Sequence, residues 1–391
     1  MTDIYILGAA RTPMGSFQGS LAGVSATDLG AVALRAALER SGLQATNLDE
    51  VLMGCVLPAA LRQAPARQAM LKAGFLESTG ATTINKVCGS GMKSLMLAAD
   101  IIKAGSANIV AAGGMESMSN APYLLEKARA GLRMGHAEIK DHMFLDGLED
   151  AQTARAMGSF AQETAHARGI TREQMDDFAR SSLLRAQTAQ RDGLFQAEIA
   201  AVEITHRQGT TLVDQDEQPL NARPDKISSL RPAFAKDGTL TAANSSSISD
   251  GASALIIASA QATQATGSHP IARLVAQATH SQAPAEFTLA PVGALRKVLE
   301  RAAWSVKDVD LFEVNEAFAM VAMLPMMDLG IPHDQLNIHG GACALGHPLG
   351  SSGSRIVVTL IHALRARQLK RGVAALCIGG GEATAVAIEL L

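Results

Sequence analysis

Residues 28–54, DLGAVALRAALERSGLQATNLDEVLMG, and residues 291–315, PVGALRKVLERAAWSVKDVDLFEVN, repeat one pattern. Each stretch has the apolar periodicity of a helix, contains the tripeptide Leu-Glu-Arg, and continues through a polar turn into a short apolar run typical of a strand. The tripeptides start at Leu38 and Leu299, which lie 261 residues apart. Similarity at a constant offset predicts a duplicated structural unit.

Two further features follow in the same order. The run Gly89-Ser90-Gly91 lies 261 residues before Gly350-Ser351-Ser352. Each run opens an apolar helical pattern and then a strand that ends in glycines, ANIVAAGGMES at 107–117 and VAALCIGGGEA at 373–383. In the first copy this predicts helices at 28–40 and 89–104 and strands at 51–56, 81–87 and 107–112. Alternating helices and strands favour mainly parallel sheets covered by helices.

The two copies are expected to form two α/β halves related by a pseudo-twofold axis, with a segment between them that matches neither. The predicted N-terminal half is residues 1–117 with 251–268, and the predicted C-terminal half is residues 269–391. Residues 118–250 are expected to form an inserted loop domain that holds a ligand. One helix in it is well marked, because Thr171 stands three residues before Gln174 in a capping-box pattern.

Composition excludes several classes of protein. The chain has 391 residues, of which 48% are hydrophobic, and a net charge of -3, so it has no global field that would gather nucleic acid or an anionic membrane. Its first residues show no basic segment followed by a long apolar stretch, so we expect a cytoplasmic protein. The four cysteines lie far apart, which favours reduced thiols over a disulfide framework or a metal site.

Cys88 lies between a predicted strand and the start of a predicted helix. Unpaired N–H groups and the positive end of the helix dipole favour a thiolate there, and Gly89 and Gly91 let a substrate approach the backbone. An isolated cysteine can equally be a small buried hydrophobe. In the repeat, position 349 corresponds to Cys88, and His347 is two residues away. A pseudo-twofold axis would bring both loops together and favours a Cys–His pair, although His347, like His339, could serve only as a structural hydrogen-bonding group.

Cys377 ends an apolar strand directly before Gly379-Gly380-Gly381, whose N–H groups could face a ligand oxygen. Alone, a cysteine in such a strand is typical of a core. Asn315 and Glu316 lie at a strand-to-helix junction, where they could be a helix cap and a first-turn acid. An amide buried there could instead hold a water or a carbonyl oxygen.

The four stretches NKVCGSGMK, NEAFA, GGACALGHPLGSSGSR and CIGGGEA, together with AARTPMGSFQGSLA from Ala9, resemble the thiolase family of acetyl-CoA acetyltransferases and 3-ketoacyl-CoA thiolases. The resemblance covers essentially the whole chain. It implies the thiolase fold, with two pseudo-twofold-related five-layered α/β/α/β/α halves and an inserted loop domain. It also implies a homotetramer, with part of residues 118–145 as a tetramerisation loop.

The resemblance implies a role for each motif residue. Cys88 would carry the acyl group as a thioester, and His347 would take its thiol proton. His347 would also bind a thioester oxygen together with a water held by Asn315. Cys377 would be the second acid and base, and the N–H groups of Cys88 and Gly379 would form the other oxyanion hole.

The substrate implied is an acyl-CoA, with no permanently bound cofactor. Ser246, which could also be a simple turn residue, and Met157 stand where relatives contact the pantetheine arm. Arg223 and Lys226 are the nearest bases that could meet the phosphates, and Arg223 is the candidate. Leu148, Ala317 and Phe318 would line the tunnel. Ala156 and Phe287 depart from the commoner His and Met of short-chain members.

The expected function is acetyl-CoA C-acetyltransferase, which condenses two acetyl-CoA to acetoacetyl-CoA and CoA in fatty acid metabolism. The alternatives are a degradative thiolase for longer 3-ketoacyl-CoA, a ketoacyl-synthase-like condensing enzyme, and a thiolase-fold protein that binds acyl-CoA or lipid without turnover. The paired thiols Cys88 and Cys377 speak against the last two, and the dependence of kcat/KM on acyl length distinguishes the first from the degradative thiolase.

Overall fold

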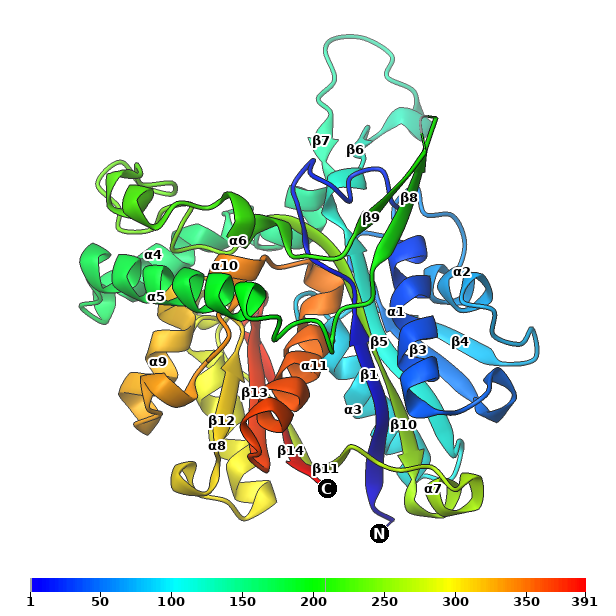
Figure 1. Cartoon of the computed structure of the whole chain (residues 1–391). Coiled ribbons are helices and arrows are strands. Elements are labelled where there is room, and N and C mark those ends of the chain that lie inside the picture. The colour runs from blue at the N-terminus through cyan, green and yellow to red at the C-terminus, as the bar shows by residue number, and fades with distance from the viewer. Residues whose placement is uncertain (1, 208) are drawn as a thin grey trace.

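A computed structural model describes residues 2–207 and 209–391. Its main sheet has ten strands, in the order β12-β13-β14-β11-β1-β10-β5-β3-β4, with β2 paired to β10 (Figure 1). The N-terminal half supplies β1 (Ile4–Arg11), β2 (Gly15–Ser16), β3 (Glu50–Gly54), β4 (Gly80–Ile84), β5 (Ile109–Ser117) and β10 (Ser249–Ser259). The C-terminal half supplies β11 (Ala272–Ser281), β12 (Leu311–Val314), β13 (Arg371–Ile378) and β14 (Glu382–Leu390).

Helices accompany both halves. Those of the N-terminal half are α1 (Ala26–Ser41), α2 (Pro65–Lys72), α3 (Ser90–Lys103) and α7 (Ala260–Thr266). Those of the C-terminal half are α8 (Ala290–Ala302), α9 (Ala319–Leu329), α10 (Ala342–Leu345) and α11 (Leu349–Arg367). The helices and strands expected in the first copy are confirmed, with ends that differ by a few residues.

The duplication is visible in the order of the elements. The series α1, β3, α3, β5 in the first half is matched by α8, β12, α11, β13 in the second. Short 3-10 turns at Ala45–Asn47 and Val306–Asp308, again 261 residues apart, join helix to strand in each copy. The second half replaces β4 by a single bridge between Phe312 and Leu336.

The expectation of mainly parallel sheets is wrong. Only β4–β3–β5 and β12–β13 pair in parallel, whereas β1, β10, β11 and β14 pair antiparallel with their neighbours. The helix-strand alternation identified the parallel strands correctly. The antiparallel strands lie beside them in the sheet without a crossover helix, and this pairing leaves no periodic signal in the sequence.

Five layers arise from the two halves together. On one side α1 and α2 pack on the N-terminal strands, and on the other side α8 and α9 pack on the C-terminal strands. Between the two groups of strands lie α3 and α11, which share one apolar core (Figure 1). The resemblance placed five layers within each half, but the central layer is common to both.

The first turns of the two central helices approach each other closely at two glycines. A Cβ atom on Gly91 would lie 2.8 Å from the carbonyl oxygen of Gly350, and one on Gly353 would lie 2.4 Å from the amide nitrogen of Met92. Both glycines are therefore required by the close approach of the backbones. This contact brings the N-termini of α3 and α11, and the loops before them, to one place.

The segment between the halves runs over that place (Figure 1). It contains β6 (Tyr123–Leu124), β7 (Lys140–Asp141), α4 (Met157–Ala167), α5 (Arg172–Arg191), β8 (Val202–His206), β9 (Gly209–Val213) and α6 (Glu217–Asn221). The capping box of Thr171 and Gln174 at the start of α5 is confirmed.

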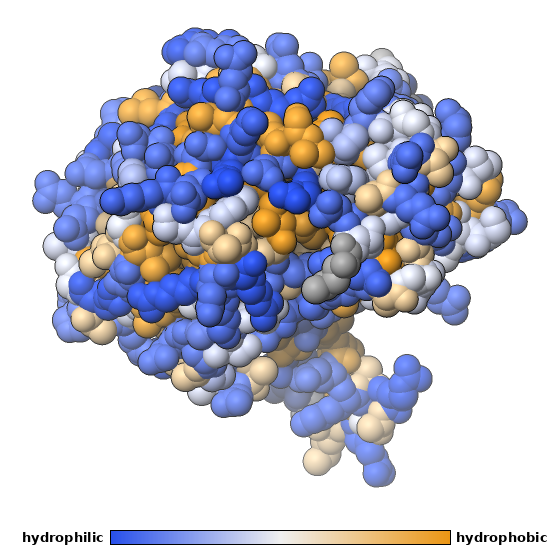
Figure 2. All heavy atoms as spheres, turned by 90° about the horizontal axis from the view of Figure 1, so that it is seen from below, coloured by the Kyte–Doolittle hydropathy of each residue, from blue (hydrophilic) through white to orange (hydrophobic). Residues whose placement is uncertain are grey.

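Seen from the end opposite the inserted segment, the surface of the molecule is largely hydrophilic with smaller hydrophobic areas (Figure 2). Across residues 2–207 and 209–391, no helix has the length and hydropathy needed to span a membrane.

Candidate active site

A mostly apolar pocket of about 210 Å³ lies under the inserted segment, at the N-termini of α3 and α11. Nine residues predicted for the site line it: Cys88, Leu148, Met157, Ser246, Ala317, Phe318, His347, Cys377 and Gly379. The structure thus brings together side chains that are up to 291 residues apart in the chain. An apolar cavity with few polar groups is the usual form of a small-molecule site.

Cys88 stands on a tight turn between β4 and α3. The amides of Gly89 and Ser90 donate to the carbonyl oxygens of Lys86 and Val87 at 3.0 Å each. Val87 has φ +45°, a conformation that is strained for a β-branched residue. The turn leaves Cys88 only half-buried, with its thiol at the pocket wall.

Burial dominates the electrostatics of this thiol. It raises the pKa of Cys88 to about 11, while hydrogen bonds from the amides of Gly379 and of Cys88 itself oppose that rise and the negative charge of Glu116 adds to it. Both amides therefore lie near the sulfur, where a thioester oxygen would also lie. This arrangement fits the oxyanion hole predicted from Cys88 and Gly379.

His347 lies in the matching loop before α11 and is 5% exposed. Its Nδ1 is 2.5 Å from Ser352 Oγ and 3.5 Å from Asn315 Nδ2, and its backbone amide donates to Ser247 at 3.1 Å. Among the described residues Nε2 has no hydrogen-bond partner. Burial, and then the charge of Arg355, lower the pKa of His347 to about 3, so the ring is neutral at physiological pH and can accept a proton.

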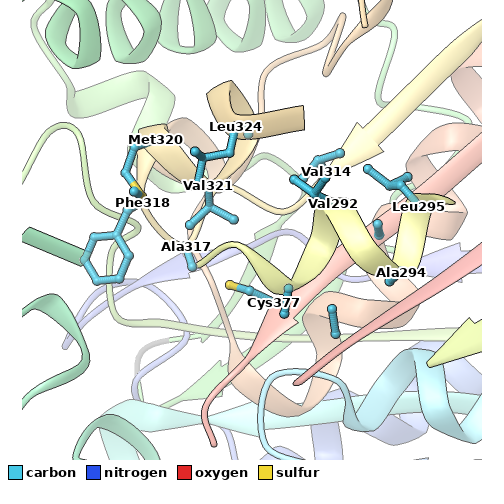
Figure 3. Packing of buried hydrophobic residues seen from close by; sticks show 14 of the residues in the cluster. Val292, Ala294, Leu295, Val314, Ala317, Phe318, Met320, Val321, Leu324 and Cys377 are labelled. Atoms are coloured by element: carbon cyan, nitrogen blue, oxygen red, sulfur yellow. The ribbon is translucent and has the colours of Figure 1, made fainter. Parts of the chain in front are cut away.

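Cys377 is fully buried at the end of β13 and reaches the pocket. Figure 3 shows it at the margin of the core cluster formed with α8 and α9, with its sulfur on the side of Ala317. Burial, and next the proximity of Cys88, raise the pKa of Cys377 well above its ordinary value. The two thiols are thus near neighbours, and both are protonated at rest.

Asn315 and Glu316 are not helix-cap residues. The helix α9 begins at Ala319 with Phe318 as its cap. The predictions of a helix cap at Asn315 and of a first-turn acid at Glu316 are therefore wrong. Glu316 accepts hydrogen bonds from Ser182, Asn337 and the amide of Cys343, which tie its loop to the His347 motif. Asn315 lies behind His347, outside the pocket lining, and its Oδ1 has no partner among the described residues. That free oxygen fits a bound water.

The residues predicted for the pantetheine arm, the tunnel and the phosphates come from separate segments. Leu148 lies on a π-helical turn at Phe144–Leu148, a feature common at functional sites. Met157 starts α4, and the amide of Ser246 donates to Ala317 at 2.9 Å. Arg223 is exposed beside a 3-10 turn and does not line the pocket.

Sequence reasoning missed Ser352, Phe234 and Glu116. Ser352 lies five residues after His347, in the first turn of the helix that was predicted to begin there. That spacing was the signal from which its contact with the ring could have been predicted. Phe234 lines the pocket from an irregular stretch without periodicity, which gave no signal.

Residues 2–207 and 209–391 contain no group of three or more His, Cys, Asp or Glu side chains that could hold a metal ion.

Comparisons with known proteins agree with this geometry. The thiolase N-terminal domain family matches residues 4–261, and the thiolase C-terminal domain family matches residues 268–390. The chain therefore belongs to the thiolase family, as its motifs predicted.

Proteins of similar sequence and of similar structure include acetyl-CoA acetyltransferases of the thiolase family. The chain is 48% identical over 385 residues to an acetyl-CoA acetyltransferase of Yarrowia lipolytica, which covers 98% of this chain and 96% of the relative. It is 47% identical to the acetyl-CoA acetyltransferase of Escherichia coli over the full length of both. The crystal structure of Acat5 thiolase from Ascaris suum in complex with coenzyme A superposes with a TM-score of 0.94 at 40% identity, and covers all of both chains. The Bacillus anthracis acetyl-CoA acetyltransferase gives 0.97 at 37% identity, covering 100% of this chain and 99% of the other. The thiolase fold is thus confirmed.

Proposed function

We propose that this protein is an acetyl-CoA C-acetyltransferase, which joins two acetyl-CoA into acetoacetyl-CoA and CoA through an acetyl group on Cys88. The observation that carries the proposal is that one apolar pocket is lined by Cys88, Cys377 and a neutral His347, whose Nε2 has no hydrogen-bond partner among the described residues. Full-length relatives with this name support it.

In the first half-reaction His347 accepts the thiol proton as the sulfur of Cys88 attacks the carbonyl carbon of acetyl-CoA. The amides of Cys88 and Gly379 stabilise the negative oxygen. The C–S bond to CoA then breaks, and the leaving thiolate takes the proton from His347. Because His347 is a weak base in this buried place, it returns the proton readily.

In the second half-reaction His347 accepts the thiol proton of Cys377, and the Cys377 thiolate then removes a proton from the methyl carbon of another acetyl-CoA. The resulting enolate oxygen is stabilised by the Nε2–H group of His347 and by a water held on Asn315. The carbanion attacks the acetyl carbon on Cys88, the bond to the sulfur breaks, and the Cys88 thiolate recovers a proton from His347, while Cys377 is again a thiol. The mostly apolar pocket limits hydrolysis of the thioester during this step.

The acyl length is set by the walls of the pocket. Phe234, Phe318 and Phe287 pack edge to face, with ring centroids 5.9 and 6.4 Å apart, and all three line the cavity. We expect kcat/KM for thiolysis of acetoacetyl-CoA to exceed that for 3-ketoacyl-CoA of six to ten carbons. A kcat/KM that rises with length would instead favour the degradative thiolase.

A protein that only binds acyl-CoA is distinguished by covalent trapping. Mass spectrometry after mixing with acetyl-CoA should find one acetyl group on the peptide that contains Cys88. Failure to trap it would favour binding without turnover.

The remaining features belong to the same proposal. The protein would work in the cytoplasm, in fatty acid metabolism, as a homotetramer without a permanently bound cofactor. Residues 121–141 expose Tyr123, Leu132 and Ile139, and Met134 is 99% exposed, as a contact loop between subunits would require. Light scattering should give four chains, and Met134→Asp should lower that number.

Arg223 is proposed to meet the phosphates of CoA from outside the pocket. An exposed contact of this kind is weak, so Arg223→Ala should raise the KM for CoA by roughly threefold and leave kcat unchanged. Lys307→Ala removes an equal charge from an exposed site far along the chain and serves as the control.

A further inference from the structure

The base His347 needs a partner for its second ring nitrogen. When Nε2 holds the proton of Cys88, both ring nitrogens carry hydrogen, and a buried N–H without an acceptor is costly. Two side chains lie near Nδ1: Ser352 Oγ at 2.5 Å and Asn315 Nδ2 at 3.5 Å. The longer contact is at the limit of a hydrogen bond, and the amide nitrogen is a donor. Ser352 Oγ is thus the acceptor available among the described residues.

The hydroxyl of Ser352 is itself oriented. It donates to the carbonyl oxygen of Pro348 at 2.9 Å, one turn earlier in α11. A hydroxyl has one hydrogen, so its lone pairs are left to face the ring. The short contact to Nδ1 then requires the hydrogen to sit on Nδ1, and Nε2 keeps its lone pair toward the pocket.

We propose that Ser352 is the positioning residue that fixes His347 in the Nδ1–H form and thereby makes Nε2 the base for Cys88. The inference rests on the proposed function for the role of that base. The hydroxyl takes the place that a carboxylate holds in a Ser-His-Asp triad. A neutral acceptor orients the ring without holding a charge beside it, so the proton can move on to the departing thiolate.

Neutron diffraction from the deuterated resting enzyme tests the assignment without a variant. The expected result is deuterium on Nδ1 of His347 and none on Nε2. Deuterium on Nε2 would overturn the proposal, because Ser352 would then donate to Nδ1.

A matched pair of variants tests the consequence. Ser352→Ala should lower kcat by roughly 10- to 100-fold, as expected for a lost hydrogen bond to a charged group, with KM changed by less than about threefold. Ser351→Ala removes the same atom one residue away, where the hydroxyl contacts Ser253 and not the ring, and should stay within about twofold of the wild type. Equal losses in both variants would show a packing effect and would overturn the assignment.

Alkylation of Cys88 by iodoacetamide separates this inference from the proposed function, because the reaction needs no CoA. Ser352→Ala should slow it by a factor similar to the loss in kcat, while Ser351→Ala should not. An unchanged alkylation rate in Ser352→Ala would count against Ser352. Slower alkylation in a protein that never forms acetoacetyl-CoA would uphold Ser352 and reject the acetyltransferase.

Discussion

The loop before α3 and the loop before α11 occupy the same place in the two copies but are built in opposite ways. Cys88 follows Val87, which is held at φ +45°, and as a residue it is half-buried at the pocket wall. His347 stands between Gly346 and Pro348, is 5% exposed, and is fixed through its backbone to Ser247. One copy of a duplicated helix start thus presents the proposed nucleophile, and the other buries the proposed base. Because α3 and α11 both start at the same pocket, the proposed nucleophile and the proposed base can come from different copies.

The strongest test of this difference removes the nucleophile. Cys88→Ala should lower acetoacetyl-CoA formation by roughly 10⁴-fold or more, since the acyl carrier is lost. The melting temperature should stay close to that of the wild type, because a small side chain replaces another. Cys55→Ala removes a buried thiol outside the pocket and is the control. Turnover retained by Cys88→Ala would end the assignment of the nucleophile.

The second test extends the comparison to the strands. By the register against β3 and β12, Cys377 of β13 stands where β5 has Met115, so only one copy supplies a second thiol. Cys377→Ala should still be acetylated on Cys88 but should lose carbon–carbon bond formation by roughly 10²- to 10⁴-fold, the range for a positioned acid and base. Mass spectrometry and product assays measure the two steps separately. Equal loss of both would mean that Cys377 is structural.

The third test concerns the charge state of the pair. Burial raises the pKa of Cys88 to about 11 and lowers that of His347 to about 3, so between these values the resting pair is a neutral thiol and a neutral imidazole. In His347→Ala, where no imidazole assists the thiol, alkylation of Cys88 in brief pulses should rise about tenfold per pH unit from pH 7 to 10, without the plateau near pH 9 of an ordinary cysteine. A plateau near pH 9 in that variant would show that burial does not raise the pKa of Cys88.

The fourth test disturbs the contact that joins the loops. In Gly353→Ala the new methyl group would meet the backbone of Met92, so the helices must separate slightly. We expect the free energy of unfolding to fall by about 1–3 kcal/mol, as for overpacked cores. Gly23→Ala, with open space around the new atom, should change it by less than about 0.5 kcal/mol. If denaturation finds the two variants equally stable, the close contact has no energetic role.

The sequence predicted what is periodic or repeated. The constant offset of 261 residues located α1, α3, β3 and β5 with their counterparts, and it placed Cys88 and His347 in corresponding loops, which both reach one pocket. Family motifs then named Cys377, Asn315 and Gly379. These features depend on local patterns that can be detected in the sequence alone.

Other features depend on contacts between distant segments and left no such pattern. The antiparallel places of β10 and β14 and the shared central layer follow from packing of the whole chain. Phe234 reaches the pocket from an irregular stretch, and Arg223 lies outside the lining although its motif position suggested a ligand contact. The place of an exposed arginine is set by the tertiary path of its loop, which composition does not reveal.

The contact between α3 and α11 also sets when the enzyme can become active during synthesis. Cys88 leaves the ribosome 259 residues before His347, and the central layer is half empty until α11 is made. The nascent N-terminal half therefore exposes apolar strand and helix surfaces that the second copy covers later. With the proposed roles, a partly made chain holds the acyl carrier without its base, so acetyl transfer begins only after nearly the whole polypeptide has folded.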